Sequence, residues 1–286
     1  MDGIIRFGPG GFGESFAALG YKKNTDTAEY LGRFGLTHFE YECGQGVRIS
    51  NASAAALGKV LRDSGITVSL HSPYFISLSS ADEEKRLGSV RYIAESARAV
   101  LALGGRRIVI HCGGTAGMTR EKALSLAIET LSLARQKVIA DGFGDVIFCP
   151  ETMGKINQLG DLDEVIEICK SDDTYIPCID FGHLYARTFG GIKEKTDFAA
   201  ILDKLEAGLG LERMRSFHCH FSKIEYTAKG GEKRHVTFDN TVWGPPFEPF
   251  IELLRERGLT PVIVCESAGT QTEDAAAMMK YYESLA

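Results

Sequence analysis

The sequence predicts a single (β/α)8 barrel, the TIM-barrel architecture, covering residues 1–286. Eight short apolar segments alternate along the chain with segments of helical pattern. Six of the apolar segments end on a residue that can ligate a metal, namely His71, His111, Glu151, Asp180, His220 and Glu266. The spacings between these residues are 40, 40, 29, 40 and 46 residues, so each is about one strand–helix unit long. In such barrels the active site lies at the C-terminal ends of the strands.

The eight apolar segments are short enough to be barrel strands. We expect strands at residues 4–7, 37–41, 66–71, 107–111, 145–149, 175–180, 216–220 and 261–266. The fourth, fifth and eighth segments are almost continuously apolar, which is typical of parallel strands buried on both faces. The fifth strand leads directly to Glu151.

Helical segments separate the strands, and several begin at a residue suited to cap a helix. We expect Thr25 or Asp26, Ser50 and Asn51, Thr119, and Thr272 at such positions. The expected helices lie at about 27–35, 51–64, 81–103, 120–140, 161–169, from 197, at 247–257 and from 272. Long loops are expected after the third strand and at 221–246, and His183 is expected on the loop after the sixth strand.

Composition limits the class of protein. The net charge of −6 argues against non-specific nucleic-acid binding, although bound divalent cations can reverse the field at a site. No apolar run reaches the roughly 20 residues of a membrane span, and the first residues lack the pattern of a signal peptide. Seven cysteines without a CxxC pair argue against a disulfide framework. We therefore expect reduced thiols and a cytoplasmic protein with no membrane partner.

The strand-end residues form the candidate metal centre together with two further histidines. The full set is His71, His111, Glu151, Asp180, His183, His220, His235 and Glu266. Imidazoles and carboxylates without thiolates suit Zn²⁺, with Mn²⁺ or Fe²⁺ as alternatives. The set exceeds what one tetrahedral ion needs, so Glu151 is a candidate to bridge two ions. His218 lies two residues before His220 on the same strand face, which indicates a deeper position.

Several motifs resemble the endonuclease IV family (AP endonuclease family 2) of the xylose isomerase-like TIM-barrel superfamily. The segments 71–78 (HSPYFISL), 151–155 (ETMGK), 178–183 (CIDFGH) and 265–267 (CES) are similar to that family's HAPYxINL, ETxG, DxxH and E[ST]P motifs. The match covers nearly the whole chain in order. It looks nearest to a compact subgroup that carries an HFSxIEY segment, here residues 220–226.

The resemblance implies a trinuclear zinc centre in a (β/α)8 barrel. One ion would be held by His71, His111 and Glu151, and a second by Glu151, Asp180, His220 and Glu266. A third would be held by His183, His235 and one more ligand. The family pattern there is DxH, but Lys233 stands two residues before His235. Glu232, three residues before, is the tentative substitute after a local shift of the chain.

The family cleaves DNA on the 5′ side of abasic sites, so the resemblance implies a zinc-dependent phosphodiesterase acting in base excision repair. Glu151 and Glu266 are the expected catalytic residues, with two to three zinc ions. Tentative contacts to damaged double-stranded DNA are Tyr74, Arg187, Lys223 and Lys233. We expect a monomer. The alternative is a divalent-metal-dependent sugar isomerase or epimerase, which shares the barrel but needs only one ion.

Overall fold

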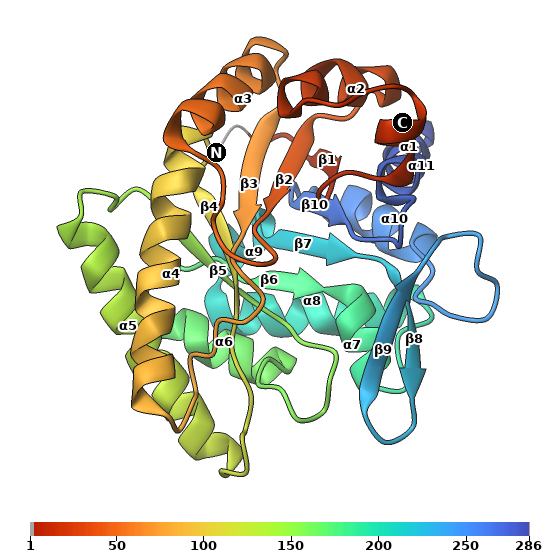
Figure 1. Ribbon diagram of the computed structural model, residues 1–286. Coiled ribbons are helices and arrows are strands. Elements are labelled where there is room, and N and C mark those ends of the chain that lie inside the picture. Colours follow the sequence, from red (N-terminus) through yellow and green to blue (C-terminus); the bar gives the residue numbers. More distant parts are fainter. Residues whose placement is uncertain (1–2, 286) are drawn as a thin grey trace.

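Eight parallel strands form the wall of a barrel in the computed structural model, which describes residues 3–285. The strands are β1 (Arg6–Pro9), β2 (His38–Glu42), β3 (Thr67–His71), β4 (Arg107–His111), β5 (Ile147–Glu151), β6 (Cys178–Asp180), β7 (His218–Phe221) and β10 (Val262–Cys265). Their order around the wall is β1-β10-β7-β6-β5-β4-β3-β2. Helices lie outside the strands (Figure 1), which confirms the expected (β/α)8 barrel.

Backbone hydrogen bonds close the barrel between its first and second strands. The Thr37 amide donates to the Phe7 carbonyl at 3.1 Å, and the Gly11 amide donates to the Glu40 carbonyl at 3.0 Å. The two strands approach so closely that a Cβ added at Gly8 would lie 1.9 Å from the His38 carbonyl oxygen. Only glycine therefore fits at position 8.

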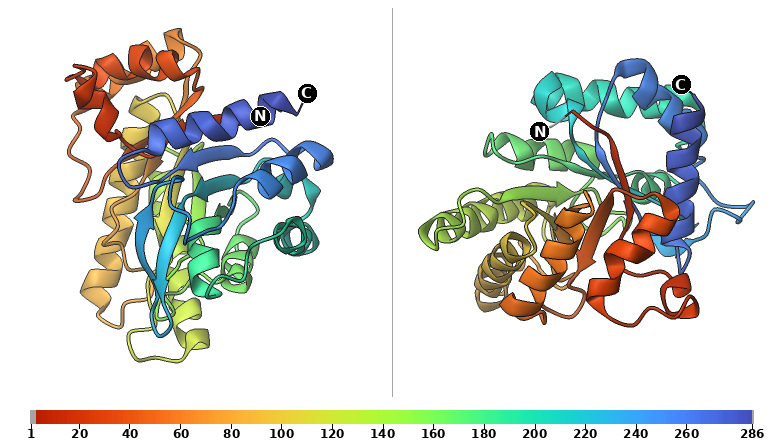
Figure 2. Two further views of the ribbon diagram at one scale, coloured as in Figure 1. Left: turned by 90° about the vertical axis from the view of Figure 1, so that its right-hand side faces the viewer. Right: turned by 90° about the horizontal axis from the view of Figure 1, so that it is seen from above.

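The outer layer consists of helices around the wall (Figure 2). They are α1 (Glu14–Ala18), the 3₁₀ turn η1 (Asn24–Asp26), α2 (Thr27–Phe34), α3 (Asn51–Asp63), α4 (Glu83–Ala102), α5 (Arg120–Ala140), α6 (Leu162–Lys170), α7 (Phe181–Arg187), α8 (Lys195–Leu209), α9 (Leu211–Arg215), α10 (Glu248–Arg257) and α11 (Gln271–Ser284). Within residues 3–285, no helix combines the length and apolar character needed to cross a membrane.

The expected helix starts are mostly confirmed. The Ser50 and Thr119 hydroxyls accept hydrogen bonds from backbone amides of the first turns of α3 and α5. Asp26 directly precedes α2. The closing helix is an exception, because its N-cap is Thr270 and Thr272 lies buried inside the helix.

Several apolar segments extend beyond the strands that they contain. The first strand begins at Arg6 rather than at residue 4, and the sixth begins at Cys178 rather than at residue 175. In β6 the first residue paired with β5 is Cys178, opposite Glu151. Tyr175 is buried before pairing starts, because its ring stacks on Phe148 with centroids 5.5 Å apart. In the sixth segment, burial of Tyr175 against β5 and against α5, whose Leu131 carbonyl accepts its hydroxyl at 3.4 Å, extends the apolar pattern beyond the paired residues.

Two expected loops contain regular structure. The 221–246 segment forms an antiparallel hairpin of β8 (Lys223–Thr227) and β9 (Gly231–Val236). This hairpin is fixed to the loop after β5, because the Glu232 amide donates to the Gly154 carbonyl and the Ile156 amide to the Gly230 carbonyl. The expectation that His183 lies on a loop was wrong. His183 is in the first turn of α7, whose N-cap is Asp180.

Gly8→Ala should lower the free energy of unfolding by roughly 3 kcal/mol or more, because its Cβ would overlap the His38 carbonyl. Gly88→Ala is the matched control. Gly88 lies inside α4 with no heavy atom within 4 Å of an added Cβ, so alanine there should stabilise the protein by about 0.5–1 kcal/mol. Urea unfolding would measure both changes. Equal stability of the two variants would contradict the described closure of β1 on β2.

Candidate metal centre

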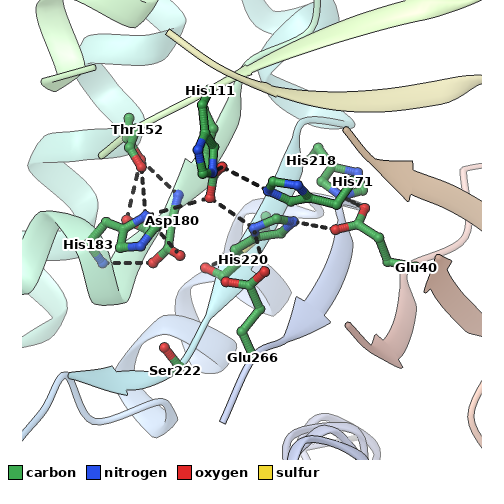
Figure 3. A network of polar contacts seen from close by, with 12 residues as sticks. Glu40, His71, His111, Thr152, Asp180, His183, His218, His220, Ser222 and Glu266 are labelled. Carbon is green, nitrogen blue, oxygen red and sulfur yellow. Dashed lines mark hydrogen bonds and ion pairs between the residues drawn. The ribbon is translucent and has the colours of Figure 1, made fainter. Parts of the chain in front are cut away.

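The expected ligands meet at the C-terminal ends of the strands. They line a cavity of about 300 Å³ whose wall includes His71, His111, Glu151, His183, Glu232, His235 and Glu266. Figure 3 shows His71, His111, Asp180, His183, His220 and Glu266 around one polar centre. The structure therefore brings together the residues that the strand ends predicted, although they come from five strands, the residue after β10, one helix and the hairpin.

Glu151 lies at the middle of this centre. It is 1% exposed, and its Oε2 atom is 3.3 Å from His71 Nε2 and 3.1 Å from His111 Nε2. Its Oε1 atom is 3.0 Å from His220 Nδ1. The two carboxylate oxygens of Glu151 therefore face two different groups of ligands, which is the arrangement expected of a bridging carboxylate.

Four residues form a second group around Glu151. Ligand atoms of Glu151, Asp180, His220 and Glu266 all lie within 4.8 Å of one another. His220 Nδ1 is 3.3 Å from Glu266 Oε1. Asp180 is fully buried, and its Oδ1 atom accepts the His183 amide at 2.7 Å. Its Oδ2 atom is buried without a hydrogen-bond partner among the described residues.

A third group consists of His183, Glu232 and His235, whose ligand atoms also lie within 4.8 Å of one another. The position of Glu232 beside these histidines has a structural cause. In the hairpin, Arg234 pairs with Glu225 of β8, and Glu232 pairs with the next residue of β8, Tyr226. Lys233 has no partner between them and is therefore the extra residue of a β-bulge. The bulge places Glu232, rather than Lys233, on the same face as His235.

Backbone and hydroxyl oxygens orient most of the imidazoles. His71 Nδ1 is 2.7 Å from the Ser72 carbonyl, and His183 Nδ1 is 2.9 Å from the Thr152 carbonyl. Because a carbonyl can only accept, each Nδ1 donates a proton, so Nε2 is the nitrogen of each ring that is available to an ion. His235 Nδ1 is 2.9 Å from the Ser222 hydroxyl. These contacts orient the three rings.

The charges of the centre shift the pKa values of its members. Burial lowers the pKa of His71, but Glu42 and Glu151 outweigh it and raise that pKa to about 10. Burial also lowers the pKa of His183, whereas Asp180 and Glu232 raise it to about 9. Burial, Glu151 and Asp180 raise the pKa of Glu266 to about 8. The centre therefore holds protons at neutral pH that divalent cations can replace.

The geometry fits divalent metal ions. Two ligands of a tetrahedral ion with bonds of about 2.0–2.1 Å lie roughly 3.3 Å apart. The nitrogen–oxygen separations around Glu151 are 3.0–3.3 Å. The buried Asp180 Oδ2 atom, which lies 3.2 Å from His183 Nδ1 and accepts no hydrogen bond among residues 3–285, supplies a further acceptor. The donor set of imidazoles and carboxylates is one that zinc, manganese and iron accept.

The tentative DNA-contact residues have different environments. Tyr74 is 58% exposed at the cavity mouth. The Arg187 guanidinium donates to the carbonyls of Met153, Lys155 and Gln158 at 2.8–3.3 Å. The Lys223 ammonium donates to the carbonyls of Phe238 and Asn240, and the Lys233 ammonium pairs with Glu225. Contact of these four residues with DNA stays a prediction.

Two acidic residues of β2 were missing from the sequence prediction. Ligand atoms of Glu40, Glu42 and Glu266 lie within 4.8 Å of one another. The alternation of His38, Glu40 and Glu42 along one strand face was the available signal. His218 lies deeper than His220 as expected, and its Nε2 atom is 2.9 Å from Glu40 Oε2.

The sequence of this chain is similar to known proteins along most of its length. Residues 28–283 match the model of the xylose isomerase-like TIM barrel. An uncharacterized protein from Methanocaldococcus jannaschii is 31% identical over 274 residues, covering 96% of this chain and 97% of that protein. A probable endonuclease 4 from Persephonella marina is 26% identical over 181 residues, which are 61% of this chain and 62% of that protein.

Solved structures share the fold. A D-tagatose 3-epimerase-like protein aligns with a TM-score of 0.71 and 20% identity over 92% of this chain and 94% of that one. Endonuclease IV from Thermus thermophilus aligns with a TM-score of 0.63 and 18% identity over 91% of this chain and 93% of that one. Together with the sequence matches, these findings confirm the resemblance drawn from the motifs.

Arg187→Ala should lower the free energy of unfolding by about 1.5–3 kcal/mol, because three carbonyls of the loop after β5 lose a charged donor. Amide exchange should quicken in that loop. Arg234→Ala is the control, since this exposed side chain makes one surface ion pair and its loss should cost under about 1 kcal/mol. If Arg187→Ala kept wild-type stability and exchange, the guanidinium would not be the anchor of this loop.

Proposed function

Because the chain belongs to the xylose isomerase-like TIM barrel family, we propose that it is a zinc-dependent phosphodiesterase. Its substrate is double-stranded DNA with an abasic site, which it cleaves on the 5′ side of the lesion as a cytoplasmic monomer. The resemblance of its motifs to endonuclease IV, and the matches to probable endonuclease 4 proteins, support this substrate class. Manganese or iron are the alternatives to zinc.

The observation that carries the proposal is the presence of three neighbouring ligand groups rather than one. Glu151, Asp180, His220 and Glu266 suffice for a single ion. The group of His183, Glu232 and His235 then has no role in a one-metal enzyme, yet it is assembled from α7 and from a hairpin fixed to the loop after β5. Several ions close together suit phosphoryl displacement, where both the attacking and the leaving oxygen need stabilisation.

The residues of the chain have separate tasks in this proposal. His71, His111 and Glu151 hold one ion, while Glu151, Asp180, His220 and Glu266 hold the second. His183, Glu232 and His235 hold the third. Bound zinc supplies an activated water and positive charge for the phosphate. Glu151 keeps two groups at a fixed separation, and Glu266, the second proposed catalytic carboxylate, completes the second group beside His220. Tyr74, exposed at the mouth, stacks on the DNA beside the lesion.

A sugar isomerase or epimerase is the second candidate. Two observations favour it: the four-residue group accommodates a single divalent cation, and the cavity of about 300 Å³ has the size of a small-molecule site. Such an enzyme would leave the third group unused.

An oligonucleotide duplex with one abasic analogue should be nicked on the 5′ side of the lesion by the zinc-loaded protein. Glu151→Gln should lower the rate by roughly 10³-fold or more, since loss of one charge-stabilising group alone costs about 10²–10³. Glu167→Gln, on an exposed face of α6, is the control and should retain activity. Absence of nicking by fully loaded wild-type protein, with conversion of a ketose instead, would favour the isomerase.

Glu232→Ala should remove one zinc ion per chain, whereas Lys233→Ala should leave the zinc content unchanged. The reason is the β-bulge, which places Glu232 and not Lys233 beside His183 and His235. Elemental analysis of protein purified without chelator measures this directly. Equal zinc content in both variants would show that Glu232 is not a ligand.

A further inference from the structure

The barrel interior beneath the metal centre is unusually polar. Interiors of such barrels are mostly filled by branched aliphatic side chains. Here Glu40 on β2, Ser69 on β3 and His218 on β7 are all fully buried at this depth. Strands β2 and β7 are separated by β1 and β10 around the wall, so their side chains meet through the barrel interior. Figure 3 shows Glu40 extending towards His218 and His220.

Three polar groups converge on the Glu40 carboxylate. Its Oε2 atom accepts hydrogen bonds from the Ser69 hydroxyl at 2.5 Å and from His218 Nε2 at 2.9 Å. Its Oε1 atom lies 2.8 Å from His220 Nε2. Among residues 3–285, neither Glu40 Oε1 nor His220 Nε2 makes a hydrogen bond of regular geometry, so their 2.8 Å contact is an ion pair. Because an uncompensated buried polar atom is costly, this contact offsets the burial of both atoms.

A second chain of contacts holds Glu40 from below. The Ser69 oxygen lies 2.8 Å from His38 Nε2, and His38 Nδ1 lies 2.8 Å from the Thr67 hydroxyl. The Ser69 hydroxyl proton is directed to Glu40, so His38 Nε2 donates to the Ser69 oxygen. His38 and Thr67 line a separate cavity of about 730 Å³ at the opposite end of the barrel. Glu40 is therefore fixed by contacts that span the barrel interior.

The two nitrogens of His220 face different partners. Nδ1 is 3.0 Å from Glu151 Oε1 and 3.3 Å from Glu266 Oε1, inside the ligand group. Nε2 faces Glu40. A neutral imidazole has one proton and one lone pair. Carboxylates face both nitrogens, but those of Glu151 and Glu266 belong to the group that would hold the ion, so Nδ1 is the nitrogen directed at that ion. Glu40 is placed to retain the remaining proton on Nε2.

We propose that Glu40 is a positioning residue of the metal centre, which selects Nδ1 of His220 as the ligand atom and fixes the plane of its ring. The inference rests on the metal centre of the proposed function and not on its DNA substrate. A sugar isomerase with the same ligands would need the same contact.

Glu40→Gln tests the role with little change in volume. The amide cannot supply the carboxylate charge beside His220, so zinc affinity should fall by about 10- to 100-fold. Competition with a chromophoric chelator measures that affinity. Ser69→Ala is the matched control, because it removes one contact to Glu40 and leaves the carboxylate beside His220. Its loss of affinity should be clearly smaller.

Nitrogen NMR of the zinc-loaded wild-type protein gives an independent readout. His220 should show a zinc-bound Nδ1 and a protonated Nε2, and Glu40→Gln should disturb this pattern without altering His71 or His111. Zinc bound through Nε2 of His220 in the wild type would overturn the proposal even if the variant failed to fold, as would unchanged affinity in a folded Glu40→Gln protein. Zinc binding with the expected pattern but no nicking would refute only the DNA substrate. A wild-type protein that bound no zinc would overturn both proposals.

Discussion

One buried carboxylate, that of Glu151, determines how the centre is arranged. It is almost inaccessible to water, and burial alone would favour its neutral form. His220, His111 and His71 instead hold its pKa well below the usual range, so the side chain is ionised. An ionised group in a barrel interior requires compensating partners on all sides. The imidazoles of β3, β4 and β7 provide them, and the wall of the barrel keeps these strands at fixed positions.

The third ligand group depends on a different support. Its members come from α7 and the hairpin rather than from the strands of the wall. Asp180 links the two supports, because it ends β6, caps α7 and contributes a carboxylate to the centre. The hairpin is fixed in turn by hydrogen bonds to the loop after β5, and Arg187 holds that loop. The groups at the strand ends are therefore held by the wall of the barrel, whereas the third group is held by α7 and the hairpin.

The meeting of the strand-end residues was predictable from the sequence because strand–helix units of similar length bring their strand ends to the same rim. His71, His111, Glu151, Asp180, His220 and Glu266 all follow this rule. Residues whose placement depends on a partner segment were harder to predict. Glu40 was missed because its role arises from contacts across the barrel, with β7, which lies far away in sequence. The helix carrying His183 was missed because its apolar residues follow β6 without a break, and only the capping carboxylate of Asp180 marks its start.

The single extra residue in β9 has a wider consequence for recognising sites of this kind from sequence. Ligand spacing written as a fixed number of residues assumes a regular strand, in which every second side chain faces the same way. One inserted residue changes the count from two to three while the same two side chains keep facing the cavity. A search that fixes the number of intervening residues would reject this chain. A search that follows which side of the ribbon each side chain occupies would retain it.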